Sequence, residues 1–143
     1  MSPRAARSSP LPARARTTPR GFSRAILDAI GREKIIGVRA GPPSAHRVVG
    51  IWAVVVDGRV FARSWTLTPG GWYRTFLEAP LGAITVGARE VRVRARHVKS
   101  ETLRDAVEAA YAAKYATPGA QTYVRGFRTK RRREATIEFL PGH

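Results

Sequence analysis

The chain has 143 residues, no cysteine and a formal net charge of +16 at pH 7. Without cysteine it has no disulfides, thiolate nucleophiles or cysteine-bound zinc, and no apolar run approaches the roughly 20 residues that cross a bilayer. The length is that of one domain, and the charge favours anionic partners. The composition predicts a soluble cytoplasmic protein whose partners are a phosphorylated cofactor or nucleic acid, and not a membrane.

The first 21 residues differ in composition from the rest of the chain. They contain five arginines, four prolines and no acid. Such a segment buries too little apolar surface to become ordered. Its prolines also interrupt both the apolar stretch of a secretory signal and the helical period of a mitochondrial transit peptide. We therefore predict a disordered basic tail over residues 1–21 and one folded domain over residues 22–143.

The first half of the folded domain predicts one helix and three strands. Ser23 can cap a helix that ends near residue 32, and a strand follows within residues 33–40. The long apolar run over residues 47–56 predicts a central strand that is buried on both faces. An Asp-Gly pair then favours a two-residue turn into a partner strand over residues 59–65.

The second half predicts two helices and three strands. A two-turn helix is expected over residues 72–79. It ends there because Pro80 disfavours helical geometry at the residue before it. Strands are expected over residues 82–87 and 90–98, and a longer helix capped by a serine over residues 100–116. A basic connector leads to a last strand at about residues 134–140. In the strand over residues 90–98, valine and alanine alternate with a row of exposed arginines: Arg92, Arg94 and Arg96.

Together these elements predict an α+β domain. About five or six strands, mostly linked by hairpins, and three helices share about 120 residues. The sheet must curl on itself to bury the apolar run. The expected fold is a small, partly open antiparallel β-barrel with three flanking helices.

The sequence contains no constellation for acid–base or metal chemistry. The three histidines and the ten acids are dispersed, so neither catalytic residues nor metal ligands are predicted. Nucleotide-binding and hydrolase motifs are also absent. An enzymatic activity would therefore depend on a bound cofactor.

Three groups of residues are candidates for binding a flat, anionic cofactor. Arg39 and Arg47 flank the loop before the long apolar strand, where two guanidiniums could meet a phosphate. Ser64 ends the third strand. The last group combines the free N–H groups of a helix start with a ring-stacking surface and an arginine: Gly70, Gly71, Trp72, Tyr73 and Arg74. Trp72 has an alternative role as a hydrophobic plug of the barrel end.

Residues from about 22 to the C-terminus resemble a bacterial family called domain of unknown function 2255. The resemblance lies in "GIWAVVVDGRVFARSW", "GGWYRTFLEAPLGAITVGAREVRV" and "DAVEAAYAAKYA", in this order. More distantly, the succession of strand, serine, loop, Trp-Tyr, helix and "VGAREVRVRA" is similar to that of the deazaflavin-dependent nitroreductases. These belong with the pyridoxamine-phosphate-oxidase-like split barrels.

This resemblance implies an FMN-binding type of split barrel, usually a homodimer, with FMN or a deazaflavin in a groove between barrel and helix. A basic loop grips the cofactor phosphate in the nitroreductases, and the matching segment holds Arg39 and Arg47. Ser64 and Trp72 match further cofactor residues. Their Gly-Arg-x-Ser-Gly loop is replaced here by "RAGPPSAHR", so the identity of the cofactor stays open. In the nitroreductases, tyrosines on and after the last helix line the substrate side of the groove. By position they correspond to Tyr111, Tyr115 and Tyr123 in this chain.

The favoured function is a flavin- or deazaflavin-dependent, nitroreductase-like oxidoreductase that acts on a small organic acceptor. One alternative is a non-catalytic nucleic-acid-binding protein, whose arginine row and basic tail contact phosphates. Against it, the sequence does not interleave aromatic residues with the basic row. The other alternative is a barrel that binds a different small anion without catalysis.

Overall fold

The computed structural model describes residues 21–42 and 47–142. The tail predicted over residues 1–21 lies, except for Gly21, outside the described residues, and the division into tail and domain stays a prediction. The helices are α1 (Arg24–Arg32), α2 (Trp72–Glu78), α3 (Glu101–Lys114), α4 (Pro118–Gly126) and α5 (Lys130–Glu134). The strands are β1 (Ile36–Ala40), β2 (Val49–Ile51), β3 (Ala53–Val56), β4 (Arg59–Arg63), β5 (Leu81–Val86), β6 (Arg89–His97) and β7 (Thr136–Pro141).

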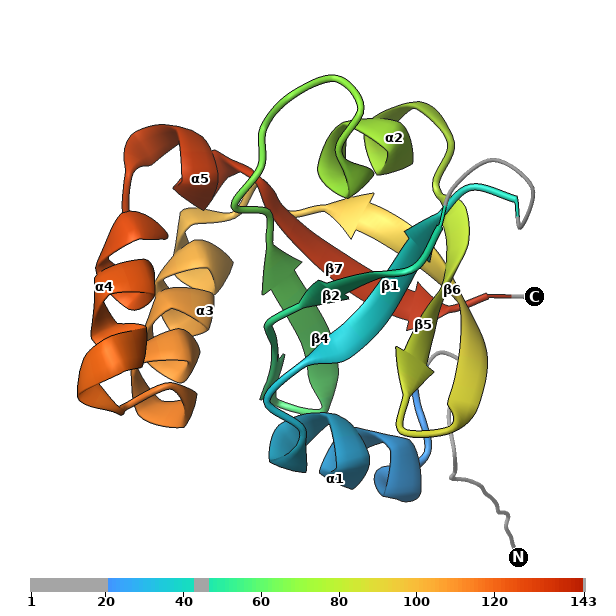
Figure 1. Ribbon diagram of the computed structural model, residues 1–143, viewed down its shortest axis with the longest axis horizontal. Helices are drawn as coiled ribbons and strands as arrows, with labels where there is room; N and C mark the ends of the chain where they lie inside the picture. Colours follow the sequence, from blue (N-terminus) through green and yellow to red (C-terminus); the bar gives the residue numbers. More distant parts are fainter. Residues whose placement is uncertain (1–20, 43–46, 143) are drawn as a thin grey trace, which may run out of the picture.

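The strands of the described chain form one antiparallel sheet in the order β2-β1-β5-β6-β7-β4-β3. β2 and β3 stand at opposite ends of this order, yet they are consecutive in the chain and separated only by Trp52. The sheet therefore curls until its two ends meet, which gives a nearly closed barrel (Figure 1). The predicted α+β antiparallel barrel is confirmed.

The long apolar run is not the central, doubly buried strand that the sequence predicted. It divides at Trp52 into β2, which pairs with β1, and β3, which pairs with β4. Closing a barrel this small requires the chain to leave one neighbour and join another, so neither half is flanked on both sides. At the start of the run Val48 is 50% exposed and Val49 is 37% exposed.

The barrel interior is an apolar core that two helices close. Each strand contributes buried side chains to it, among them Val38, Val60 and Phe139. α1 lies across the lower end of the barrel and inserts Ile30, whereas α2 lies across the upper end and inserts Phe76 (Figure 1). None of the helices in the described ranges is long and apolar enough to cross a bilayer.

Local signals placed several of these elements correctly. The hydroxyl of Ser23 accepts a hydrogen bond from the backbone N–H of Ile26 at 3.2 Å and caps α1 as predicted. Asp57 and Gly58 form the turn of the β3–β4 hairpin with φ angles of 52° and 74°. This left-handed conformation is the one that an Asp-Gly turn favours.

α4 and α5 add two helices to the three that were predicted. They lie between the helix predicted over residues 100–116 and the last strand, and α5 begins within the predicted basic connector. Thr117 accepts a hydrogen bond from the backbone N–H of Ala120 and caps α4, with Pro118 at its start. Only one apolar stripe of α4 is buried, including Val124, so α4 depends on packing against α3 and the outer side of β4 rather than on its own periodicity.

On the outer face of the sheet, Glu138 of β7 is a buried carboxylate between two arginines. Arg59 donates two hydrogen bonds to it, at 2.8 and 2.9 Å, and Arg96 donates one at 2.8 Å. Burial would raise the pKa of Glu138, but the hydrogen bonds and charges of the two arginines outweigh burial and lower it. Glu138 therefore holds both guanidiniums in fixed positions on the sheet.

We expect Glu138→Gln to lower the free energy of unfolding by about 1–3 kcal/mol at pH 7, because charge-assisted hydrogen bonds are lost. A carboxylate whose pKa is lowered on folding contributes stability above its ordinary pKa of 4.5, and the contribution is lost as the pH falls through the folded value. Urea unfolding measured from pH 7 to pH 3 should show that the free energies of unfolding of the parent and of Glu138→Gln become equal in acid.

Glu90→Gln is the matched control, because Glu90 is exposed and lies 3.6 Å from Arg39. Its cost should stay below about 1 kcal/mol. A Glu138→Gln deficit that does not shrink in acid would contradict this account of Glu138.

Candidate functional site

A cleft of about 710 Å³ opens beside β2, where the barrel is not closed. Its floor is formed by residues of β1 and β2. One wall is the loop over residues 65–71 together with the start of α2, and the other wall is α4. The cleft therefore follows the edge of β2 that faces away from β1.

Five aromatic side chains line the cleft. They are Trp52, Trp65, Trp72, Tyr123 and Phe127. The ring of Tyr123 meets Trp65 edge to face at a centroid distance of 5.2 Å, and it meets Trp52 in the same way at 5.7 Å. Tyr123 is 50% exposed and Trp65 is 39% exposed. These half-open rings offer apolar surface to a flat ligand.

Trp65 is held in place by contacts with α4 and α5. The guanidinium of Arg132 lies 3.8 Å from the centroid of the indole ring, and its Nε donates to the Trp65 carbonyl at 3.0 Å. On α4, Gly126 leaves room for the indole, since a Cβ atom at this position would overlap the ring of Trp65. The position of this wall thus depends on a glycine.

Trp52 rests on a second layer of tyrosines. The ring of Tyr115 is stacked on it at a centroid distance of 4.1 Å, and the Tyr115 hydroxyl donates to the Lys34 carbonyl at 2.6 Å. The hydroxyl of Tyr111 donates to the Trp52 carbonyl at 2.6 Å. Burial raises the pKa of both hydroxyls, which keeps them protonated as donors. Tyr111 and Tyr115 thus support the cleft from beneath, and of the three predicted substrate tyrosines only Tyr123 lines it.

The charged residues that line the cleft are all cations. They are Lys34, Arg47 and the fully buried Arg63, which is paired with Glu108, and neither Asp nor Glu lines the cleft. Lys34 and Arg47 are exposed, and the Nζ of Lys34 lies 5.9 Å from the centroid of the Trp52 ring. Within the described ranges, no three His, Asp or Glu side chains gather as metal ligands would. The cleft is suited to an anion that carries a flat apolar ring.

Arg63 is fully buried behind the cleft wall. Its guanidinium donates to the Thr136 hydroxyl at 2.8 Å, the Glu108 carboxylate at 3.0 Å, and the carbonyls of Phe127 and Arg104 at 3.1 and 2.7 Å. Burial lowers the pKa of Arg63, partly against the effect of Glu108. One side chain therefore ties β4 to β7, to α3 and to the end of α4.

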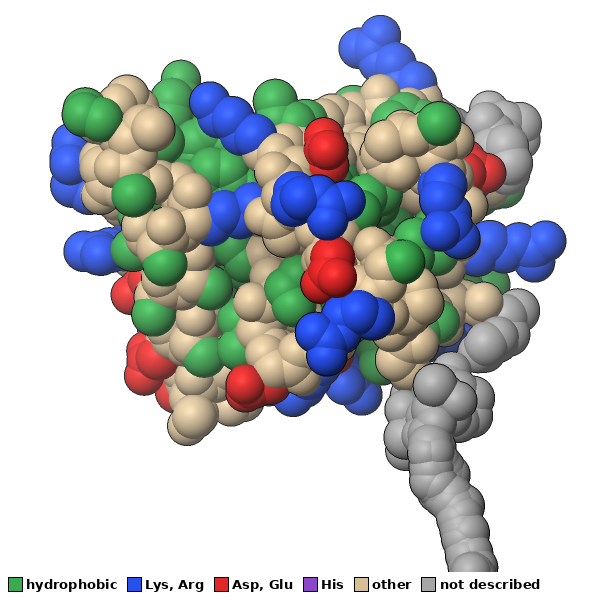
Figure 2. All heavy atoms as spheres, turned by 90° about the horizontal axis from the view of Figure 1, so that it is seen from below, with side chains coloured by type: hydrophobic (Ala, Val, Ile, Leu, Met, Phe, Trp, Pro, Cys, Tyr) green, Lys and Arg blue, Asp and Glu red, His purple; other side chains and the backbone are tan. Residues whose placement is uncertain are grey.

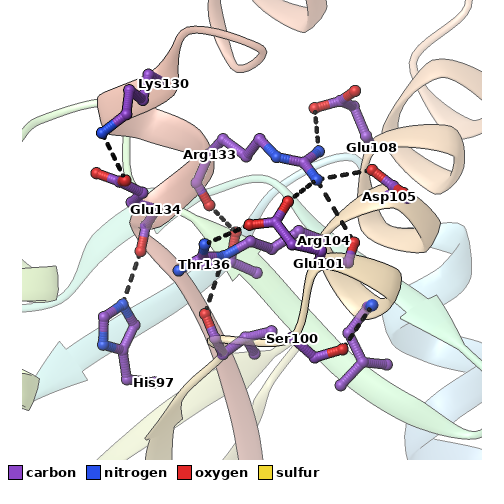
Figure 3. Close-up of polar contacts among 12 residues, drawn as sticks. His97, Ser100, Glu101, Arg104, Asp105, Glu108, Lys130, Arg133, Glu134 and Thr136 are labelled. Carbon is purple, nitrogen blue, oxygen red and sulfur yellow. Dashed lines mark hydrogen bonds and ion pairs between the residues drawn. The ribbon is translucent and has the colours of Figure 1, made fainter.

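The same cluster of charges extends to α5. Arg133 reaches Glu101 and Asp105 at 2.7 Å each and Glu108 at 3.2 Å (Figure 3). Hydrogen bonds with these carboxylates raise the pKa of Arg133. α5, which carries the arginine that stacks on Trp65, is thereby fixed against α3.

Among the predicted cofactor residues, the cleft brings together Arg47, Gly70, Gly71 and Trp72. Trp72 is the first residue of α2. Its ring also packs against Phe139 inside the barrel at a centroid distance of 6.0 Å. The two roles considered for Trp72, wall and plug, therefore coincide in one side chain.

Arg39 and Ser64 do not line the cleft. Arg39 donates to the Gly41 carbonyl at 2.6 Å and faces Glu90, so it does not meet Arg47 in the cleft. The hydroxyl of Ser64 is buried and donates to the Thr66 carbonyl. The structure gives Ser64 a role in the turn that leads into the loop.

Tyr73 and Arg74 also lie outside the lining. The Tyr73 ring faces the ring of His97 at a centroid distance of 5.7 Å, with the hydroxyl 3.4 Å from Nε2. Arg74 is exposed on α2. Of the Gly-Gly-Trp-Tyr-Arg motif, the first three residues therefore line the cleft and the last two do not.

Sequence reasoning did not identify Lys34, Trp52, Trp65 or Phe127 as site residues. Trp52 stands in an apolar run typical of a core strand, and Phe127 stands among arginines. The available signal was two tryptophans in predicted strands, Trp52 within residues 47–56 and Trp65 at the end of residues 59–65. Only closure of the barrel brings these distant residues together.

Residues 27–139 match the family described as "Uncharacterized protein conserved in bacteria (DUF2255)". The chain belongs to this family. The matched region runs from α1 to β7 and contains the whole cleft. No curated protein sequence is significantly similar to the chain.

Solved structures of low sequence identity share the fold of this family member. A conserved hypothetical protein of Mycobacterium tuberculosis has a TM-score of 0.58 at 13% identity, covering 87% of this chain and 82% of that one. A putative pyridoxamine 5′-phosphate oxidase of Listeria innocua has a TM-score of 0.54 at 8% identity, and the match covers 82% of this chain and 90% of that one. A FAD-binding protein of Mesorhizobium loti has a TM-score of 0.51 at 12% identity, and the match covers 84% of this chain and 88% of that one. The predicted split-barrel fold is confirmed.

Proposed function

We propose that this member of the family binds FMN or a deazaflavin in the cleft and acts as an oxidoreductase on a small organic acceptor. The observation that carries the proposal is the lining itself, which combines aromatic walls with cations and contains no acid. Fold neighbours described as FAD-binding and as a pyridoxamine-phosphate oxidase add support.

The residues of the cleft fit such a cofactor. Its volume of about 710 Å³ is within the usual range of small-molecule sites. Trp65 and Tyr123 present partly exposed ring surface for a tricyclic ring. The guanidinium of Arg47 would bind a phosphate or carboxylate of the side chain bidentately, and Lys34 provides a second cation.

In this proposal the protein binds and orients, and a bound flavin or deazaflavin supplies the redox chemistry. The aromatic walls exclude water from one side of the ring. Gly70 and Gly71 leave the loop wall without side chains, so backbone can approach the ligand closely. The acceptor would enter beside Tyr123, which is the most exposed ring of the lining.

The homodimer that the resemblance implies remains part of the proposal. Four of the most exposed large apolar side chains line the cleft, namely Ile35, Val49, Trp65 and Tyr123. We expect a second copy to cover Ile35 and Val49, while the entrance beside Tyr123 stays open.

Arg47→Ala should weaken FMN binding about tenfold, since a charge-assisted hydrogen bond contributes about 1.5 kcal/mol at an exposed site. Arg74→Ala is the matched control, because it removes the same charge from α2 outside the cleft, and it should bind as the parent does. Titration calorimetry with FMN and with riboflavin, which lacks the phosphate, separates the phosphate contact from ring stacking.

The small-anion alternative makes a different prediction in the same titration. A barrel that binds only an anion would bind inorganic phosphate as tightly as FMN and would not bind riboflavin. Equal losses in Arg47→Ala and Arg74→Ala would contradict the placement of the phosphate.

A further inference from the structure

The outer face of β5 and β6 carries a second concentration of positive charge, remote from the cleft. α1 and α2 close the barrel ends, while α3 and α4 lie at β3 and β4, so within the described chain no helix covers this face (Figure 1). Strand register places the side chains in rows across the face. The arginine face, as we define it, comprises Arg59, Arg92, Arg94 and Arg96, and it is bordered by Arg39, whose side chain is only 12% exposed.

Its arginines are spaced by the sheet. Arg92 and Arg94 are two residues apart on β6, roughly 7 Å along the strand, and both are exposed. Arg39 lies in the same row as Arg92, with Ala83 of β5 between them, roughly 10 Å away. The spacing is fixed by backbone pairing and not by flexible side chains alone.

Acids neutralise only part of the charge of this face. Glu138 is buried and holds Arg59 and Arg96 in place, and Glu90 faces only Arg39. Arg92 and Arg94 have no ion pair with any of the ten acids, all of which are described. By contrast, the lower face of the molecule, around α1, mixes acidic and basic side chains (Figure 2). The arginine face is therefore a preorganised site for a repeating anion.

We propose that the arginine face binds the sugar–phosphate backbone of a nucleic-acid duplex without sequence preference. Arginine forks suit phosphate oxygens, and the regular rows match a polymer of phosphates better than one small anion. Among residues 21–42 and 47–142, the large apolar side chains between the arginines are Leu81 and Leu140. This part of the face therefore offers no ring on which an unpaired base could stack. The chain also enters α1 next to the β5–β6 hairpin, and residues 1–20 add five arginines and no acid.

The test is fluorescence anisotropy of a short labelled DNA duplex with the full chain over a range of salt concentrations. Arg92→Ala/Arg94→Ala should weaken binding about tenfold and reduce the slope of log K against log salt by about 1.8, since each phosphate contact contributes about 0.9. Arg125→Ala/Arg128→Ala removes the same charge from exposed positions at α4 and should change neither quantity. Equal losses in the two pairs would show that binding follows net charge alone, and would overturn the proposal.

Leu81→Glu is a second variant that keeps every arginine. Leu81 is 50% exposed and lies opposite Arg94, so the melting temperature should be unchanged while duplex binding falls. Unchanged duplex affinity in Leu81→Glu would overturn the proposal. The proposal would also be overturned if Arg92→Ala/Arg94→Ala weakened binding to vesicles of anionic phospholipid and left binding to the duplex unchanged. FMN binding should be unaffected in all these variants, which separates this face from the cleft.

Discussion

Replacing Arg63 by methionine is expected to lower the free energy of unfolding by about 3–5 kcal/mol, the usual cost of removing one partner from a buried ion pair. Methionine fills much of the volume but leaves the Thr136 hydroxyl and the carbonyls of Phe127 and Arg104 without their donor. Glu108 keeps only Arg133 as an ion-pair partner. Four elements would lose their common contact at once.

Urea unfolding at pH 7 measures this cost, and Arg128→Met is the control. Arg128 is exposed and near the end of α4, so its replacement should change stability by no more than about 0.5 kcal/mol. A loss below about 1 kcal/mol in Arg63→Met would show that the cluster around Arg63 does not fix the wall of the cleft.

Gly126→Ala is expected to lower FMN affinity by about tenfold to a hundredfold while stability changes little. The added Cβ overlaps the Trp65 ring, so the indole must move from its place between α4 and Arg132. The displaced indole no longer presents its ring face to the ligand, and a tenfold to hundredfold loss of affinity corresponds to about 1.4–2.8 kcal/mol of binding free energy. Because Trp65 is partly exposed, it can move without unfolding the barrel.

Gly119→Ala provides a control on the same helix. A Cβ at Gly119 meets open space, so this variant gains the same helix propensity as Gly126→Ala without touching the cleft. Calorimetric titration of the two variants with FMN measures the difference. Equal FMN affinity in Gly126→Ala and Gly119→Ala would exclude Trp65 as a binding wall.

The barrel could be predicted because its signals are local. The Asp57-Gly58 turn, the cap at Ser23 and the alternation along β6 each depend on a few neighbouring residues. The alternation correctly placed the arginine row on the outside. Helix α4 escaped prediction because its apolar stripe is short and becomes meaningful only against α3.

The cleft could be predicted only in part. Trp72 and the two glycines before it were identified from a contiguous motif, and they do line the cleft. Trp52 and Trp65 could not be identified in this way. They reach the same cleft only because β2 and β3 separate at Trp52 and the loop after β4 folds against α4. Arg39 shows the converse, because closeness to Arg47 in sequence did not bring the two side chains together.

The most direct test of the central claim is a titration of the purified protein with FMN and with a deazaflavin, followed by tryptophan fluorescence. All three tryptophans line the cleft, so a ring bound there must quench their emission. We expect saturable quenching with one ligand per chain, a weaker response in Arg47→Ala and little response in Gly126→Ala. Emission that stays unchanged up to about 1 mM of either ligand, the weak end of the affinity scale, would contradict the proposed function.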